Sequence, residues 1–181
     1  MGRYVALLRG INVGGRNLIK MAELKACFEE HGFRDVATYI QSGNVLFEAD
    51  ERSSKRLAQR IEEVLAARFD YQASVVLRTR AQMRSIEERA PDGFGRQPDR
   101  YRYDVLFLKS PLRANSAIES VPVKEGVDHV DAGPGVLYFS RLISRASQSR
   151  LSRIVSMPIY QSMTIRNWNT TMKLLKMMDA P

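Results

Sequence analysis

Leu7 to Asn17 read L-L-R-G-I-N-V-G-G-R-N, and this stretch joins an apolar run to an amphipathic one through a loop that holds three glycines. The run Arg3–Arg9 is short, apolar and bounded by arginines, which predicts a buried strand. After the loop, Met21–His31 places apolar residues at helical spacing, and Gly32 is suited to end the helix. The opening therefore predicts a strand, a glycine-rich turn and a helix in succession.

The residues that follow alternate between strand and helix patterns. Residues 35–41 and 44–48 alternate as two strands, and Ser42-Gly43 between them is a hairpin signal. A helix is expected over 53–68, with Ser53 as its N-cap, and residues 72–79 are rich in β-branched side chains. The resulting order, β-α-β-β-α-β, is that of a ferredoxin-like domain.

The second half of the chain repeats this order in outline but is expected to finish on a helix. Proline and glycine mark Pro91–Arg100 as the clearest loop in the chain. The expected elements after it are strands at 103–109, 126–131 and 136–140 and helical stretches at 111–120, 147–156 and 166–178.

These patterns predict an α+β protein of two ferredoxin-like (βαββαβ-type) subdomains with antiparallel sheets. The first subdomain is expected at 1–90, a linker at 91–101, and a second α+β subdomain with a C-terminal helix at 102–181. The topologies of the halves resemble each other, but no residue-level repeat is visible in the sequence.

The net charge of +8 is concentrated at the two ends of the chain. Residues 1–20 hold four basic side chains and no acidic one, and residues 141–181 hold seven basic side chains against Asp179 alone. The residues between them carry a net charge of −2. If the two ends meet in space, they form a cationic field that attracts an anion. The alternative is an ordinary solvated basic surface.

The glycine-rich loop has features of an anion site. A strand that ends in such a turn and leads into a helix points backbone N–H groups outward, towards a phosphate or carboxylate. The glycines do not have the spacing of a P-loop or of a dinucleotide-binding fingerprint. The alternative is that they only form turns. The candidate ligand-binding residues of this loop are Arg9, Gly10, Asn12, Gly14, Gly15 and Arg16.

The C-terminal stretch T-I-R-N-W-N-T-T-M-K offers a second cationic site. Thr164 or Asn167 is suited to cap the expected helix, and a helix N-terminus favours an anion through its dipole and free N–H groups. A capped amphipathic helix with a solvated face is the alternative. The candidate ligand-binding residues here are Arg166, Asn167, Asn169 and Lys173.

The hairpin tip offers weaker candidates, because Gln41, Ser42 and Asn44 could make polar contacts to a ligand. Ser42 is not in a G-x-S-x-G elbow, so a hydrolase triad is poorly supported. His31 and His129 have no second histidine or cysteine at a ligand spacing, and no metal site or cofactor is predicted.

Composition suggests a cytoplasmic protein. The chain of 181 residues has no apolar run long enough to span a membrane, and no secretory signal is visible. The single cysteine, Cys27, cannot form an internal disulfide and fits a reducing compartment.

Three motifs together give the chain a family resemblance: L-L-R-G-I-N-V-G-G, Y-I-Q-S-G-N-V-L-F and T-I-R-N-W-N-T-T. With them the chain resembles a bacterial family catalogued as domain of unknown function 1697, over nearly its whole length. The resemblance implies a cytoplasmic α+β protein of two ferredoxin-like subdomains, and it supplies no activity or catalytic residue. The positions that match the family pattern are Arg9, Gly10, Asn12, Gly14, Gln41, Ser42, Gly43, Asn44, Arg166, Asn167, Trp168 and Asn169.

We therefore expect a basic cleft between the N-terminal loop and the C-terminal helix that binds a phosphate-bearing ligand, either a nucleotide or a nucleic acid. Arg9, Arg16 and Arg166 would neutralise the charge of that ligand. A small-molecule enzyme of unknown reaction and a protein-interaction module are the alternatives, and fold alone does not decide among them. The sequence does not indicate an oligomeric state.

Overall fold

The computed structural model describes residues 2–12, 15 and 18–180. The chain forms two units. The first consists of Met1–Met83 and Leu174–Pro181, and the second consists of Arg84–Lys173. The boundaries lie inside two helices, α3 (Arg80–Glu88) and α5 (Trp168–Asp179). The residues expected as a linker, 91–101, therefore lie inside the second unit.

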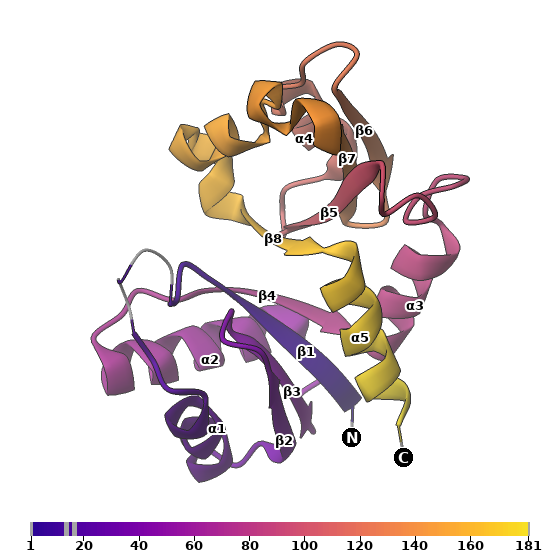
Figure 1. The fold of residues 1–181 in the computed structure, drawn as a ribbon. Helices are drawn as coiled ribbons and strands as arrows, with labels where there is room; N and C mark the ends of the chain where they lie inside the picture. Colours follow the sequence, from indigo (N-terminus) through magenta and orange to yellow (C-terminus); the bar gives the residue numbers. More distant parts are fainter. Residues whose placement is uncertain (1, 13–14, 16–17, 181) are drawn as a thin grey trace. The chain divides into compact units, whose positions relative to one another are not determined.

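The first unit has one four-stranded antiparallel sheet with two helices on one face (Figure 1). Its strand order, β2-β3-β1-β4, confirms the predicted ferredoxin-like arrangement. The elements are β1 (Gly2–Arg9), α1 (Met21–Glu30), β2 (Arg34–Tyr39), β3 (Asn44–Ala49), α2 (Ser54–Phe69) and β4 (Ser74–Thr79).

The core of this unit follows from the two periodicities of the sequence. Alternate residues of β1 (Tyr4, Ala6 and Leu8) face the helices. The inner face of α2 is a stripe at every fourth residue, formed by Leu57, Ile61 and Leu65, all fully buried. Ser53 caps α2 as predicted, because its side chain accepts a hydrogen bond from the Arg56 N–H.

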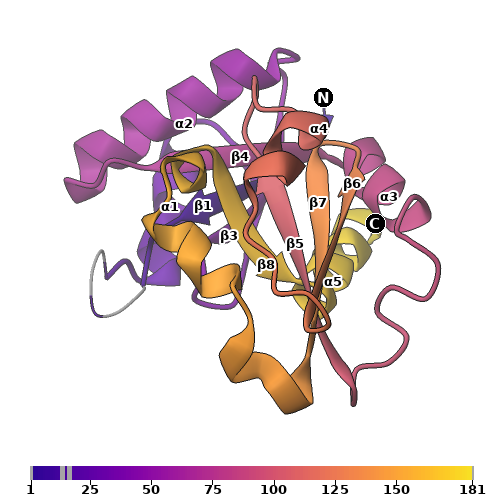
Figure 2. The same ribbon diagram turned by 90° about the horizontal axis from the view of Figure 1, so that it is seen from above.

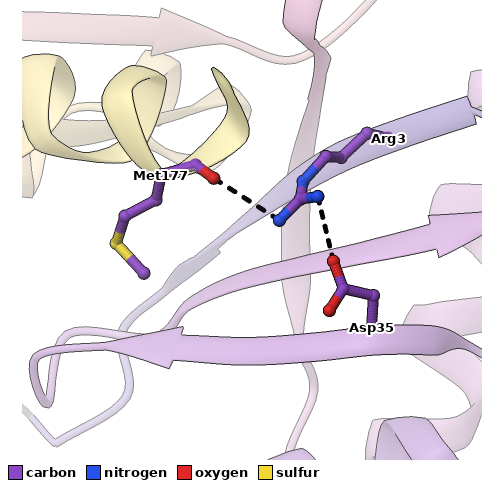
Figure 3. Close-up of polar contacts among 3 residues, drawn as sticks. All are labelled: Arg3, Asp35 and Met177. Carbon is purple, nitrogen blue, oxygen red and sulfur yellow. Dashed lines mark hydrogen bonds and ion pairs between the residues drawn. The ribbon is translucent and has the colours of Figure 1, made fainter. Parts of the chain in front are cut away.

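The last turns of α5 belong to this first unit. The Arg3 guanidinium donates from Nη2 to the carbonyl of Met177 at 3.4 Å, and its Nη1 lies 2.9 Å from a carboxylate oxygen of Asp35 (Figure 3). Arg3 of the N-terminal basic stretch therefore makes a hydrogen bond to the C-terminal basic stretch, 174 positions away in the chain.

The second unit repeats the fold around a sheet of order β6-β7-β5-β8 (Figure 2). Two short turns, α4 and η1, stand where the first unit has α1, and three 3₁₀ segments, η2 to η4, stand where it has α2. The elements are β5 (Tyr101–Leu108), α4 (Ala114–Ala117), η1 (Ile118–Ser120), β6 (Asp128–Gly133), β7 (Val136–Leu142), η2 (Ile143–Gln148), η3 (Leu151–Ser156), η4 (Pro158–Ser162) and β8 (Met163–Asn167).

Strand β8 corrects the prediction of a helix that begins at Arg166. Arg166 pairs with Val105 in the sheet, and the helix starts only at Trp168. The β-branched Thr164 and Ile165 favour a strand, and the side chain of Asn167 then caps the helix. The second half therefore has the complete βαββαβ order, followed by α5.

The two sheets correspond residue by residue, although the sequence shows no evident repeat. The N–H of Leu8 donates to the Gly43 carbonyl at 2.9 Å, and that of Leu108 donates to the Gly135 carbonyl at 3.0 Å. Both glycines have a positive φ, near +70°. Val5 lies opposite Arg78 as Val105 lies opposite Arg166. This correspondence provides a way to compare candidate residues in the two units.

Candidate functional site

Asn12 organises the N-terminal loop in the first unit. Its side-chain amide donates to the carbonyls of Ile19 at 3.0 Å and Gln41 at 2.9 Å, and its oxygen accepts from the Ile19 N–H at 2.8 Å. These bonds tie the loop to itself and to the β2–β3 hairpin, so two of the predicted motifs form one structure. They use both donors of Asn12, which gives this residue a structural role.

Gly43 fixes the contact between the hairpin and the loop. A Cβ at this position would lie 2.6 Å from Ile11 Cδ1 and 2.8 Å from Leu8 Cβ, and the φ of +74° disfavours any side chain. Gly43 is therefore required so that the hairpin tip can pack against the buried Ile11.

The remaining tip residues divide between structure and surface. Asn44 is fully buried, and its amide donates to the Tyr39 carbonyl and to the Ser42 hydroxyl oxygen, both at 2.9 Å. Gln41 is exposed, and Ile40 is half exposed with a φ of +50°, a strained value for a β-branched residue. The surface of the tip therefore consists mainly of Ile40 and Gln41.

The other loop candidates are only partly within the described residues. Gly14 and Arg16 lie outside them. Gly10 has a φ of +74° and makes the turn out of β1, and Gly15 has a φ of +75° and is exposed. No described atom lies within 4 Å of where a Cβ of Gly15 would stand, so a ligand can approach this part of the backbone closely.

Arg9 is placed at the end of β1, where its carbonyl accepts a hydrogen bond from the Tyr71 hydroxyl. Its side chain lines an open groove of about 360 Å³ together with Glu62 and Glu63 of α2. The two carboxylates offset the positive charge of the groove, so Arg9 stands in a mixed electrostatic environment.

The C-terminal candidates lie in the second unit at the junction of β8 and α5. Arg166 is 8% exposed, and its Nη1 donates to the Thr164 hydroxyl at 2.9 Å and the Ile165 carbonyl at 2.8 Å. Asn167 accepts from the Thr170 N–H at 2.7 Å and so caps α5. Asn169 and Lys173 are exposed on the first turns of the helix. Arg166 is therefore an interior charge, whereas Asn169 and Lys173 are accessible from solvent.

Sequence reasoning missed Arg78, the counterpart of Arg166 in the first unit. Its Nη1 donates to the Leu77 carbonyl at 2.8 Å, just as Arg166 donates to Ile165. Arg78 is 9% exposed, and burial lowers its pKa to about 10. A basic residue at the end of an apolar strand and just before a helix, in L-R-T and I-R-N, is the signal that would have identified the pair.

Sequence reasoning also missed an aromatic cluster in the second unit. Phe94, on the expected linker, packs edge-on against Tyr103, Tyr138 and Trp168, with ring centroids 4.8, 5.3 and 5.2 Å apart. A Cβ on Gly95 would lie 2.3 Å from the Trp168 indole nitrogen. The loop is thus docked on the sheet, and it packs against Trp168, the first residue of α5.

The predicted ligand-binding residues therefore fall into two local groups. The loop and hairpin candidates meet in the first unit through Asn12, and the β8–α5 candidates lie together in the second. The structure gives Asn12, Asn44 and Asn167 internal hydrogen bonds, and it leaves Gly15, Gln41, Asn169 and Lys173 exposed. No described helix is both long and apolar enough to cross a membrane.

Comparison with known proteins identifies relatives at the level of family and fold. Residues 1–138 match the family described as protein of unknown function (DUF1697), which confirms the resemblance seen in the three motifs. The chain is also similar to the solved structure of SP0830, a conserved bacterial protein from Streptococcus pneumoniae. That likeness has a TM-score of 0.85 and 28% identity, and it covers 98% of this chain and 99% of the other. No curated protein matches the sequence.

Proposed function

The chain belongs to the family described as protein of unknown function (DUF1697), and from its charge and geometry we propose that it binds a phosphate-bearing ligand. The observation that carries the proposal is the distribution of charge. No Asp or Glu stands between Asp131 and Asp179, a stretch that holds seven basic side chains. A surface of one sign attracts a polyanion and accelerates its association.

The exposed residues of this stretch support a nucleic-acid backbone over a mononucleotide. Arg145 and Arg153 are exposed on η2 and η3, and Lys173 is exposed on α5. These cations are spread over three elements of the second unit. A polymer of phosphates uses such a distributed charge better than a single phosphate does.

The start of α5 supplies the local geometry for one phosphate. The first N–H groups of a helix carry partial positive charge; Asn169 is exposed in the first turn of α5 and Lys173 in the second. The buried guanidinium of Arg166 adds a fixed positive charge nearby. In this proposal Arg166 acts through its charge and does not touch the ligand.

In the first unit the proposal relies on the glycine-rich loop. Gly15 is exposed and open, and Arg9 lies at the end of the strand that leads into the loop. The proposal includes Gly14 and Arg16, from the same loop, among the ligand-binding residues. It also places the protein in the cytoplasm, where such ligands are abundant and where the unpaired Cys27 stays reduced.

The test uses the single tryptophan, Trp168, as a reporter of the β8–α5 junction. The protein is titrated with a short single-stranded oligonucleotide, a mononucleotide and a sugar phosphate at low and high salt. We expect a saturable fluorescence change with the oligonucleotide. Contacts to about four phosphates would weaken binding roughly 50-fold between 50 and 200 mM salt.

Charge-removing variants identify the surface that binds. Lys173→Gln should reduce the logarithmic salt slope by about 0.7, the contribution of one phosphate of a single strand. Lys55→Gln removes a lysine that is also exposed, on α2, and should leave the slope unchanged. Binding that is insensitive to salt and equal for the mononucleotide would redirect the search to a small-molecule pocket. No response to any of the ligands would contradict the proposal.

The two buried arginines provide a matched pair for the second part of the test. Arg166→Met and Arg78→Met remove the same group from equivalent strands of the two units. Both should destabilise the fold, but only Arg166→Met should weaken oligonucleotide binding once folding of each variant has been checked. Equal effects on binding would show that Arg166 acts only through stability.

A further inference from the structure

A cavity of about 250 Å³ lies on the second unit, between the loop that follows Pro91 and one face of strands β5, β7 and β6. Its walls combine aromatic rings, Phe94, Tyr101 and Tyr103, with the carboxylates of Asp92 and Asp131. The family description assigns no role to this cavity, and the phosphate proposal does not use it. Its volume equals that of about eight liquid waters, so it suits a small ligand.

The sheet fixes the positions of the side chains at the base of the cavity. Tyr103, Ser140 and His129 lie directly opposite one another across β5, β7 and β6. Tyr101 lies two residues before Tyr103 and Asp131 two residues after His129, so both point to the same face of the sheet. The Nε2 atom of His129 lies 3.0 Å from a carboxylate oxygen of Asp131, which orients both groups at the rim.

The loop that forms the opposite wall is also held in place. The Phe94 N–H donates to the Pro91 carbonyl at 2.9 Å, and the Gln97 N–H donates to the Tyr103 hydroxyl oxygen at 3.3 Å. The Phe94 ring is packed between three other aromatic rings. A preformed wall of this kind lowers the entropic cost of binding.

The chemistry of the walls favours a positively charged ligand. Aromatic faces attract cations through their quadrupole, and Asp92 and Asp131 supply negative charge at the same opening. The structure already contains one such contact, because the Arg100 guanidinium carbon lies 5.4 Å from the centroid of the Tyr101 ring. The described residues include no group of three His, Cys, Asp or Glu side chains that could hold a metal ion. The walls therefore suit an organic cation.

We propose that this aromatic cavity binds a small organic cation, an ammonium or amidinium group on a compact apolar body. The apolar body lies against Phe94 and Tyr103, and the cationic group lies between the carboxylates of Asp92 and Asp131. The site is distinct from the phosphate-binding surface and has the opposite sign. The two proposals can therefore fail independently.

The test is calorimetric titration of the full chain with benzylamine and benzamidine. Benzyl alcohol, which has the same ring but no charge, is the neutral comparison. A ligand of this size should bind with a Kd of about 1 mM, and the alcohol should bind at least about fivefold more weakly. Equal binding of the alcohol and the amine, or no binding of either cation, would overturn the proposal.

Three variants separate the contribution of charge from that of the rings. Asp131→Asn and Tyr103→Leu should each weaken binding of benzylamine about fivefold or more. Glu119→Gln removes an exposed carboxylate elsewhere in the second unit and should have no effect. An equal loss with Glu119→Gln would mean that benzylamine responds only to overall charge, and the cavity would not be the site. Trp168 fluorescence checks that the docked loop is unchanged in each variant.

Discussion

The two units of this protein have the same strand order and almost the same register, but they cover one face of their sheets differently. The first uses a helix of 16 residues, α2, where the second uses three 3₁₀ segments of five or six residues each. The difference shows which parts of a ferredoxin-like fold need a specific residue at one position and which need only a suitable pattern of apolar and polar residues.

The shared part of the two units is set by the sheets. Each has a glycine of positive φ at the start of the third strand and a buried arginine near the end of the fourth. A one-residue slip would turn every apolar side chain to the wrong face, so register is strongly specified where a face is buried. This constraint persists although the two halves show no evident sequence repeat.

The differing part follows from sequence composition. Residues 143–162 contain six serines and Pro158, and serine competes with the helix by bonding to nearby backbone groups. The buried side chains Leu151 and Ile154 are three positions apart, the repeat of a 3₁₀ helix. The same segment exposes Arg145 and Arg153, which the phosphate proposal uses.

The largest expected effect comes from truncating one core side chain in each unit, under the helix α2 in the first and under the 3₁₀ segments in the second. Ile61 on α2 and Ile154 on η3 are both fully buried. Ile61→Ala should destabilise the protein by about 4 kcal/mol, because a regular helix relaxes little around a cavity. Ile154→Ala should cost less, about 2 kcal/mol, because short 3₁₀ segments can collapse into the space.

Urea denaturation measures both variants. Far-UV circular dichroism follows the whole chain, and Trp168 fluorescence follows the second unit, to which it belongs. Equal costs at the two positions would show that the 3₁₀ segments are as rigid as α2. The difference between the helix and the 3₁₀ segments would then have no consequence for the cost of a core cavity.

A second difference concerns a buried ionisable group. Tyr138 in the second unit occupies the position of Leu46 in the first, and its hydroxyl donates to the Ile86 carbonyl at 2.7 Å. Burial raises the pKa of Tyr138 to about 12. The neutral form is favoured in the folded state, so the protein should lose stability as pH rises from about 10 to about 12.

The loss over this range should approach about 2 kcal/mol and should be absent in Tyr138→Phe. The variant should be less stable than the wild type below pH 10, because it loses one hydrogen bond. Stability measured by urea denaturation between pH 9 and 12 checks both effects. An unchanged alkaline loss in Tyr138→Phe would assign the titration to another group.

Periodicity in the sequence predicted the first unit well. The apolar run of β1, the alternation at 35–41 and 44–48 and the stripe at Leu57, Ile61 and Leu65 all correspond to observed elements. Strand β8 was missed because it has five residues, and Arg166 within it resembled the exposed face of a helix. Its β-branched residues are too few to decide the matter, and the pairing with β5, about 60 residues earlier in the chain, makes Met163–Asn167 a strand.

The candidate site was predicted unevenly for a related reason. Local motifs identified the loop and the hairpin, but the hydrogen bonds that give Asn12 a structural role join positions up to 29 residues apart. The aromatic cavity was missed because a loop with two prolines and two glycines is typical of a linker. The packing of Phe94 against Trp168 depends on tertiary structure, which local patterns do not record.

The smallest expected effect concerns the helix caps that follow the two buried arginines, and it separates capping from ligand contact. Thr79 accepts from the Gln82 N–H at 3.2 Å, and Asn167 accepts from the Thr170 N–H at 2.7 Å. Alanine at either position should cost about 1 kcal/mol. Asn167→Ser should restore the stability because serine also caps. If Asn167→Ser restores stability in urea but not oligonucleotide binding, Asn167 contacts the ligand directly. If it restores both, the role of Asn167 is to hold the start of α5 in place.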